Sequence, residues 1–398
     1  MTNDDLDLFS DARTERHRPV RKPRKRKRRR AVLWVSMVAV LGLIAAGGYY
    51  GLTQILDIGS YDDYPGKGES QVVVQVENGQ STGDIAATLA EADVVASSRA
   101  FIAAAETDER VRAIQPGYYV VKTKSSGPAA VDQIVAKDAK VGNLQIRAGT
   151  QLDDIKTGGK VTPGIIALLA QASCAELNGK STCVPPEQLR TSMQKADLAK
   201  LGVPDWAAPY ATKADPVRRL EGLVMPGVYD VKPGSSPEEL WQQVMKDSTT
   251  QLQAVGMPNI AQETGFTPYQ VTVMASLIER EAIEKDFGKV SRVTYNRLAK
   301  RMQLQYDSTI NYVLDQPDIR TDEADRNKAG PYNTYQNTGL PPTPIAAASP
   351  EAFKSAAAPE NGKWLYFVRC EKDGTSCFAT NQAQHDKNIA TARDRGAY

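Results

Sequence analysis

The chain has 398 residues, too many for one ordinary hydrophobic core, which indicates two or more domains. Its 41% apolar and 24% charged residues are typical of globular proteins and exclude a largely disordered chain. The net charge of +2 conceals an asymmetry. Residues 1–30 hold twelve Lys and Arg against five acids, a net of +7, so the remainder carries a net of −5.

An uncharged segment follows this basic tail. Residues 31–52 carry no charge, and as a helix they would span about 33 Å, enough for a hydrocarbon core of about 30 Å. We therefore predict a single transmembrane helix at 31–53, with the tail in the cytoplasm and the rest of this cell-membrane protein outside. The alternative is a cleaved signal peptide ending near 45–47. We interpret the basic run as a topology signal and predict no nucleic-acid partner.

All four cysteines lie on the predicted outer side, where disulfides form. Four cysteines allow three connectivities, and local spacing favours Cys174–Cys183 and Cys370–Cys377. For the second pair, a two-residue turn at Asp373-Gly374 would place the two cysteines directly opposite each other in a hairpin. The chain has only two histidines and no Cys/His spacing typical of zinc sites, so we predict no metal and no other cofactor.

The outer region divides by its turn and apolar patterns into four parts. They are a linker at 54–70, a small unit at 71–140, a connecting region at 141–215 and a larger unit at 216–398. In the small unit we predict strands at 71–76 and 117–121, and helices at 81–92, 97–106 and 131–136. The connecting region indicates a strand and a helix start within 144–155, and an insertion at 174–183 to which no role is assigned.

The larger unit combines helices with a hairpin. We predict helices at 268–283, 288–300 and 351–357, and strands around the cysteines at 370 and 377. Taken with the small unit, this pattern predicts an α+β fold.

The helix at 268–283 places an acid against apolar surface. Its apolar stripe contains Val271, Met274, Ala275, Leu277, Ile278 and Ala282. At about 100° per residue, Glu281 lies within roughly 40° of the stripe's centre and Glu279 about 120° from it. Burial would raise the pKa of Glu281, as a general acid at neutral pH requires. The alternative is an edge residue paired with Lys285. We expect Glu279 to be an ordinary solvated side chain.

The two glutamates cannot act together as a glycosidase pair. Two residues apart on a helix, they point in nearly opposite directions, whereas paired carboxylates must flank one bond. The candidates for a second acid are Asp307 and Glu221. Each also has a structural interpretation, Asp307 as a helix cap and Glu221 as a turn residue.

Several sequence blocks occur in the order found in a known family. They include Leu220-Glu221-Gly222 with a following Pro and Tyr, Ala275-Ser276-Leu277-Ile278-Glu279-Arg280-Glu281, and the segments 295–298, 302–309, 332–335, 339–345 and 366–368. These blocks resemble the endolytic murein transglycosylase family, also called YceG-like. The resemblance is strong over 216–388 and weaker over 71–155, where the family carries a LysM-like region suited to glycan binding.

The resemblance implies a lytic transglycosylase, a lyase of cell-wall biogenesis. Such an enzyme cleaves nascent peptidoglycan strands at MurNAc–GlcNAc bonds without water, leaves 1,6-anhydroMurNAc ends and limits strand length. Glu281 occupies the family's catalytic position. The implied architecture is a transmembrane helix, a small LysM-like αβ subdomain and a larger α+β catalytic domain, with glycan strands and peptidoglycan synthases as partners. Polar and aromatic candidates for lining the cleft, each also explicable as fold support, are Asn296, Gln305, Asp307, Tyr332, Asn333, Thr334 and Tyr335.

The sequence departs from the family pattern at two places. Asp307-Ser308-Thr309 stands where the family has Asp-Pro-Thr, and Ser376 stands where it often has His. Two other functions remain open: a non-catalytic, membrane-tethered glycan-binding scaffold, and a hydrolase using Glu281 together with Asp307.

Overall fold

The structure, a computed structural model, describes residues 60–314 and 323–397. The predicted cytoplasmic tail, the predicted transmembrane helix and the first six residues of the linker, 54–59, lie outside these residues. Within the described ranges, no helix has the length and hydropathy needed to cross a bilayer.

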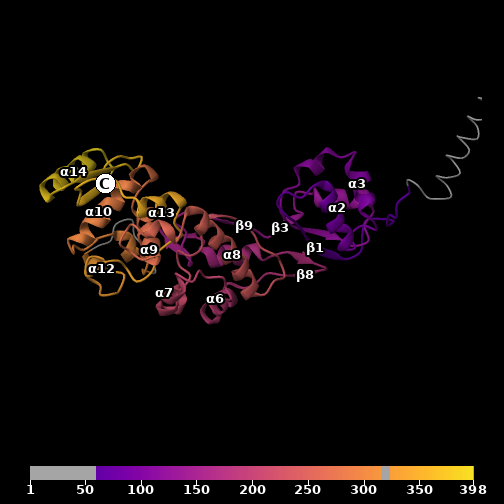
Figure 1. Ribbon diagram of the computed structural model, residues 1–398, viewed down its shortest axis with the longest axis horizontal. Helices are drawn as coiled ribbons and strands as arrows, with labels where there is room; N and C mark the ends of the chain where they lie inside the picture. The colour runs from indigo at the N-terminus through magenta and orange to yellow at the C-terminus, as the bar shows by residue number, and fades with distance from the viewer. Residues whose placement is uncertain (1–59, 315–322, 398) are drawn as a thin grey trace, which may run out of the picture. The chain divides into compact units, whose positions relative to one another are not determined.

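In the small unit, two helices follow the first strand along the chain and precede the strand with which it pairs; Figure 1 labels β1, α2 and α3. β1 (Gln71–Val76) runs antiparallel to β2 (Gly117–Lys122), and β2 pairs with the short β3 (Lys140–Val141). The helices are α2 (Thr82–Glu91), α3 (Ser98–Ala105) and, after β2, α4 (Gly127–Ile134), with a 3-10 turn at Glu109–Ala113. Each α-helix begins after a serine whose hydroxyl accepts a backbone N–H, which satisfies an otherwise unpaired donor. The third helix begins four residues before its predicted start.

The connecting region consists of short hairpins and helices. β4 (Asn143–Ile146) pairs with the distant β9 (Gly227–Asp230), and β5 (Ile155–Thr157) pairs with β6 (Lys160–Thr162). The predicted helix start at the end of 144–155 is therefore wrong. Gly158 and Gly159 both adopt positive φ, which suits the tight turn of a two-residue hairpin. The other elements are α5 (Ile165–Ala172), β7 (Glu176–Leu177), β8 (Lys180–Ser181), α6 (Pro186–Lys195) and α7 (Ala208–Lys213).

The larger unit surrounds one buried helix, α9 (Pro268–Glu281). All eight residues from Val271 to Ile278 are buried, including the polar Thr272 and Ser276, so α9 is enclosed on more sides than a single apolar stripe predicts. It packs against α10 (Phe287–Ala299), α11 (Asp307–Asn311) and α13 (Pro350–Ala357). The unit also contains α8 (Pro237–Val255), α12 (Glu323–Asn327), β10 (Tyr366–Arg369), β11 (Ser376–Ala379) and α14 (Gln382–Asp394).

Both predicted cysteine pairs lie at disulfide distance, with Cα atoms 4.0 Å apart for Cys174–Cys183 and 5.6 Å apart for Cys370–Cys377. The predicted hairpin register at the second pair is wrong. Cys377 lies opposite Val368, and the N–H of Cys370 donates to Thr375. The turn therefore contains four residues instead of two, and the bridge joins diagonal neighbours on one face of the hairpin.

Candidate active site

The helix α9 begins and ends with well-defined backbone geometry. Thr267 and Gln270 form a reciprocal capping box, and Pro268 occupies the first turn, where its missing N–H is harmless. The helix ends at Glu281, because Ala282 is extended with φ −144° and ψ 172°. Glu281 is therefore the last residue of a rigid, buried helix.

The carboxyl of Glu281 lies against the start of α11. The backbone N–H of Ser308 donates to its Oε1 at 3.4 Å. Burial raises the pKa of Glu281 to about 7; contact with Ser308 opposes this shift, and the negative charge of Asp307 adds to it. Lys285, the alternative partner predicted from helical spacing, instead contacts Asp373 at 3.1 Å. The carboxyl is thus placed where a proton is retained near neutral pH.

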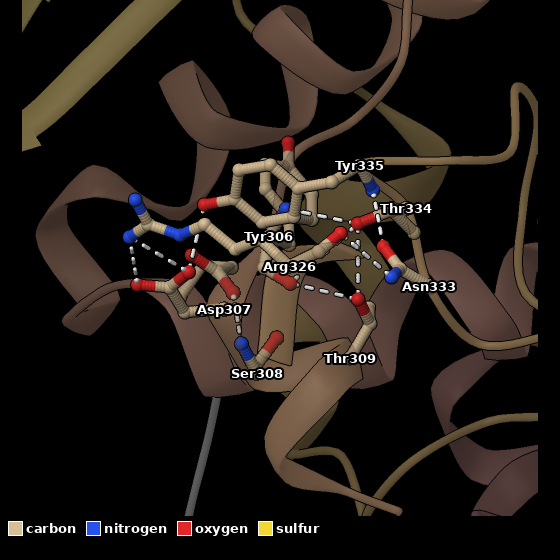
Figure 2. Close-up of polar contacts among 9 residues, drawn as sticks. Tyr306, Asp307, Ser308, Thr309, Arg326, Asn333, Thr334 and Tyr335 are labelled. Atoms are coloured by element: carbon tan, nitrogen blue, oxygen red, sulfur yellow. Dashed lines mark hydrogen bonds and ion pairs between the residues drawn. The ribbon is translucent and has the colours of Figure 1, made fainter. Parts of the chain in front are cut away.

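Asp307 is held by two residues from later in the chain (Figure 2). The hydroxyl of Tyr335 donates to Asp307 Oδ1 at 2.7 Å, and Arg326 Nη2 lies 3.4 Å from the same oxygen. The Arg326 guanidinium also lies 5.1 Å from the centroid of the Tyr335 ring. Asp307 is the first residue of α11, and Tyr306 precedes it at the cap position, so the cap interpretation is wrong. Asp307 is a positioned anion beside Glu281.

Two further predicted residues, Thr334 and Asn333, stabilise the segments around Asp307 through hydrogen bonds. Thr334 is buried, and its hydroxyl accepts the N–H of Tyr306 at 2.9 Å (Figure 2). The buried Asn333 donates its amide to the carbonyls of Arg326 and Lys328 at 3.0 and 2.6 Å. Its Oδ1 accepts the N–H of Tyr335 at 2.9 Å. Both side chains organise the segment that carries Tyr335.

Three other predicted residues make hydrogen bonds that do not reach Glu281 or Asp307. Asn296 donates to the carbonyls of Gly362 and Trp364 at 3.2 and 2.8 Å. Gln305 is exposed with φ +53°, and its backbone N–H donates to the carbonyl of residue 334. Tyr332 is buried, with its hydroxyl 2.7 Å from the hydroxyl of Thr343. These hydrogen bonds stabilise the fold.

Glu221 is a second acid with a raised pKa, in a separate environment. It lies in a turn, as expected, but the residue is only 2% exposed. It accepts the N–H of Leu152 at 3.2 Å and the hydroxyl of Tyr312 at 2.9 Å. Burial raises the pKa of Glu221 to about 7. Tyr312 follows the last residue of α11, so Glu221 anchors the end of α11 opposite to Asp307.

Glu279 is not the solvated side chain that the helical pattern predicts. Its Oε2 accepts both the N–H and the hydroxyl of Ser349, at 2.9 and 2.5 Å. Ser349 in turn caps α13, so Glu279 joins α9 to that helix. Sequence reasoning also missed Ser308 and Arg326 as neighbours of the acids. Their roles depend on contacts across 27 and 19 residues, for which the sequence carries no local signal.

A cavity of about 540 Å³ lies beside the first half of α9. Its walls include the rings of Tyr210, Phe266, Tyr269 and Tyr295, and the loop at 339–342. Glu281, at the other end of the helix, does not line it. The described part of the chain contains no group of three or more His, Cys, Asp or Glu residues that could hold a metal ion.

Comparison with known proteins shows the family to which the chain belongs. Residues 74–391 match the family model described as the YceG-like family. The chain belongs to the YceG-like family. A crystal structure of a YceG-like protein from Listeria monocytogenes has a similar fold, with a TM-score of 0.53 and 24% identity, covering 80% of this chain and 98% of that one.

Two relatives share more sequence with this YceG-like chain. The endolytic murein transglycosylase of Streptococcus pneumoniae serotype 2 is 27% identical over 370 residues, covering 89% of this chain. This chain spans 64% of the length of that relative. The endolytic murein transglycosylase of Bacillus subtilis is 28% identical over 335 residues, covering 80% of this chain and 84% of the relative.

Proposed function

We propose that this YceG-like protein is an endolytic lytic transglycosylase that cuts nascent peptidoglycan strands at MurNAc–GlcNAc bonds. Its products would carry 1,6-anhydroMurNAc ends, and its activity would limit strand length. The names of the relatives from Streptococcus pneumoniae and Bacillus subtilis support this reaction. The observation that carries the proposal is the carboxyl of Glu281, whose pKa is raised to about 7 by burial at the end of a rigid helix.

One acid suffices for this chemistry. Protonated Glu281 gives its proton to the glycosidic oxygen as the bond from that oxygen to C1 of MurNAc breaks. The resulting carboxylate then accepts the proton of the MurNAc C6 hydroxyl, whose oxygen forms the new bond to C1. Glu281 is therefore protonated again at the end of the reaction, and no water is consumed. The other strand leaves with a free hydroxyl. A pKa near the operating pH suits both proton transfers.

The neighbours of Glu281 have supporting roles in this mechanism. The Ser308 N–H orients one carboxyl oxygen, and the Asp307 charge favours the protonated form of the acid. The same charge would stabilise the positive character that develops at C1 as the glycosidic bond breaks. Tyr335 and Arg326 keep Asp307 in place. Asp307 is thus assigned an electrostatic role, and Glu281 the proton transfers.

We further propose that residues 31–53 anchor the protein as a single-pass span with its larger unit outside the membrane. The hydropathy and the basic flank of this segment support the assignment. The small unit at 71–140 would act as a LysM-like glycan-binding subdomain; the family resemblance of this segment and its two helices between paired strands support the assignment. Peptidoglycan synthases, which supply nascent strands, are the proposed partners.

Digestion of nascent, uncrosslinked glycan strands by the full chain tests the reaction. Mass spectrometry should find anhydro ends, whereas a hydrolase using Glu281 and Asp307 would give products heavier by one water. Glu281→Gln should abolish cleavage, and Glu284→Gln, which removes an exposed carboxylate three residues away, should not. A non-catalytic glycan-binding scaffold would yield no cleavage with any of the three proteins, and that outcome would reject the enzyme.

A further inference from the structure

A second cavity, of about 640 Å³, lies between β4 and the end of α5. Its volume is within the range of ligand-binding sites. In contrast to the aromatic cavity beside α9, its walls carry amide, hydroxyl and guanidinium groups, from Asn143, Gln145, Arg147, Thr162 and Gln171. This composition matches the hydrogen-bonding needs of a polar ligand.

Strand alternation explains why these groups face the same side. Along β4 and the residue after it, Leu144 and Ile146 are buried, whereas Asn143, Gln145 and Arg147 are exposed. Successive side chains of a strand point to opposite faces, so the three polar residues form one row. Across the ribbon, Gln145 lies opposite Val228, which is 63% exposed. An exposed apolar side chain on β9 therefore lies next to the polar row on β4.

The polar groups of this row, and that of Gln171 on α5, are not used by the fold. In residues 60–314 and 323–397, the side chains of Asn143, Gln145, Arg147 and Gln171 make no hydrogen bond or ion pair with another protein group. No acidic side chain lines the cavity. Lys140, also in its wall, is already 3.3 Å from Asp230, which leaves Arg147 as the lining cation without an acidic partner.

The cavity is connected to the candidate active site by hydrogen bonds. The turn that follows Arg147 places the carbonyl of Gly149 3.2 Å from Nη1 of Arg280, the residue before Glu281. The N–H of Gly149 and the carbonyl of Thr150 pair with Ala347, at 2.8 Å each, which fixes this turn to the segment after the loop at 339–342. These hydrogen bonds tie the wall of the cavity to the last turn of α9.

We propose that this cavity is a subsite that binds a part of the glycan strand away from the bond that is cleaved. The inference rests on the proposed function, because an endolytic enzyme holds sugars on both sides of the scissile bond. The amides of Asn143, Gln145 and Gln171 pair with acetamido groups, which offer one donor and one acceptor each. Arg147 binds a carboxylate of the peptide attached to MurNAc. Val228, opposite Gln145 on the neighbouring strand, packs against a sugar face beside the cavity.

The double variant Gln145→Ala/Arg147→Ala tests the subsite. Both side chains are exposed and unpaired, so the variant should keep the thermal midpoint of the wild type. With long glycan strands as the substrate, KM should rise about tenfold, the effect of losing two or three hydrogen bonds, while kcat is retained. The matched control Gln253→Ala removes an exposed amide from α8 and should leave both constants unchanged.

Binding measured without turnover separates this inference from the proposed function. In the Glu281→Gln background, fluorescently labelled glycan strands should bind the double variant about tenfold more weakly than the parent. Unchanged KM and unchanged binding, with cleavage intact, would overturn the subsite and leave the proposed function standing. Absence of cleavage by the wild type would instead reject the proposed function, and the binding comparison would still decide whether the cavity takes glycan.

Discussion

The backbone N–H of Ser308 donates to Oε1 of Glu281 across 27 residues of sequence, at 3.4 Å. This contact joins the last residue of α9 to the first turn of α11, so two buried elements fix one carboxyl. Burial is the main cause of the raised pKa of Glu281, and because α11 begins with Asp307, the same junction brings a negative charge that adds to the shift. The candidate site therefore depends on the packing of α11 on α9 more than on any single motif.

Glu281→Gln should lower the rate of strand cleavage by at least about 100-fold, because the amide cannot give up a proton to the leaving oxygen. The rate should be measured with purified nascent strands near pH 6.5, with folding checked by circular dichroism. Glu284→Gln is the control and should cleave at the wild-type rate. A Glu281→Gln enzyme with unchanged activity would remove Glu281 from the mechanism.

Asp307→Asn should move the basic limb of the pH–rate profile to lower pH. The Asp307 charge helps to raise the pKa of Glu281, so its removal lowers that pKa and the protonated acid is lost earlier as pH rises. The profile of kcat/KM between pH 5 and 9 measures this shift. A limb that stays in place, while Asp307→Asn lowers the rate equally at every pH, would show that the charge does not act on Glu281.

Tyr335→Phe should lower kcat several-fold and leave KM nearly unchanged. The phenyl ring keeps the packing under Arg326 but removes the hydroxyl that donates to Asp307 at 2.7 Å. Loss of this charge-assisted hydrogen bond should cost roughly 1–3 kcal/mol in positioning or stability. Steady-state kinetics and a thermal melt separate the two effects. A rise in KM alone would instead indicate that Tyr335 contacts the sugar.

Glu221 should make the stability of the protein depend on pH. Its pKa is about 7 in the folded state and near 4.5 when unfolded, so the folded state binds more protons between these values. The stabilisation is fully present below about pH 4.5 and is lost as pH rises through 7, by roughly 3 kcal/mol at 1.36 kcal/mol per pKa unit. Urea unfolding at pH 5 and pH 8 should show a smaller loss for Glu221→Gln than for the wild type.

Much of the fold could be predicted because its signals are local. The strand at 71–76 is confirmed without change, and α9 begins at the predicted Pro268 because Thr267, Pro268 and Gln270 define a helix start within four residues. The hairpin register predicted at the second disulfide is wrong, because the sequence Asp-Gly suggests a two-residue turn. The observed turn instead has the Gly374 N–H donating to Glu371.

The site was predicted less completely than the fold, and for a physical reason. The placement of Glu281 against apolar surface follows from helical periodicity, which one segment contains. The contacts of Glu279 with Ser349 and of Asn296 with Trp364 span 70 and 68 residues. Such pairs form only when distant elements pack, so their residues could be identified as polar but not assigned to partners.

The protonation state of Glu281 is the central claim, and it can be measured directly. With ¹³C-labelled Glu carboxyls, the resonance absent from Glu281→Gln identifies the residue, and its chemical shift is followed from pH 3 to pH 9 by NMR. We expect a titration midpoint near 7 that coincides with the basic limb of the cleavage rate. A midpoint near the ordinary value for glutamate, with cleavage unaffected between pH 5 and 8, would contradict the proposed mechanism.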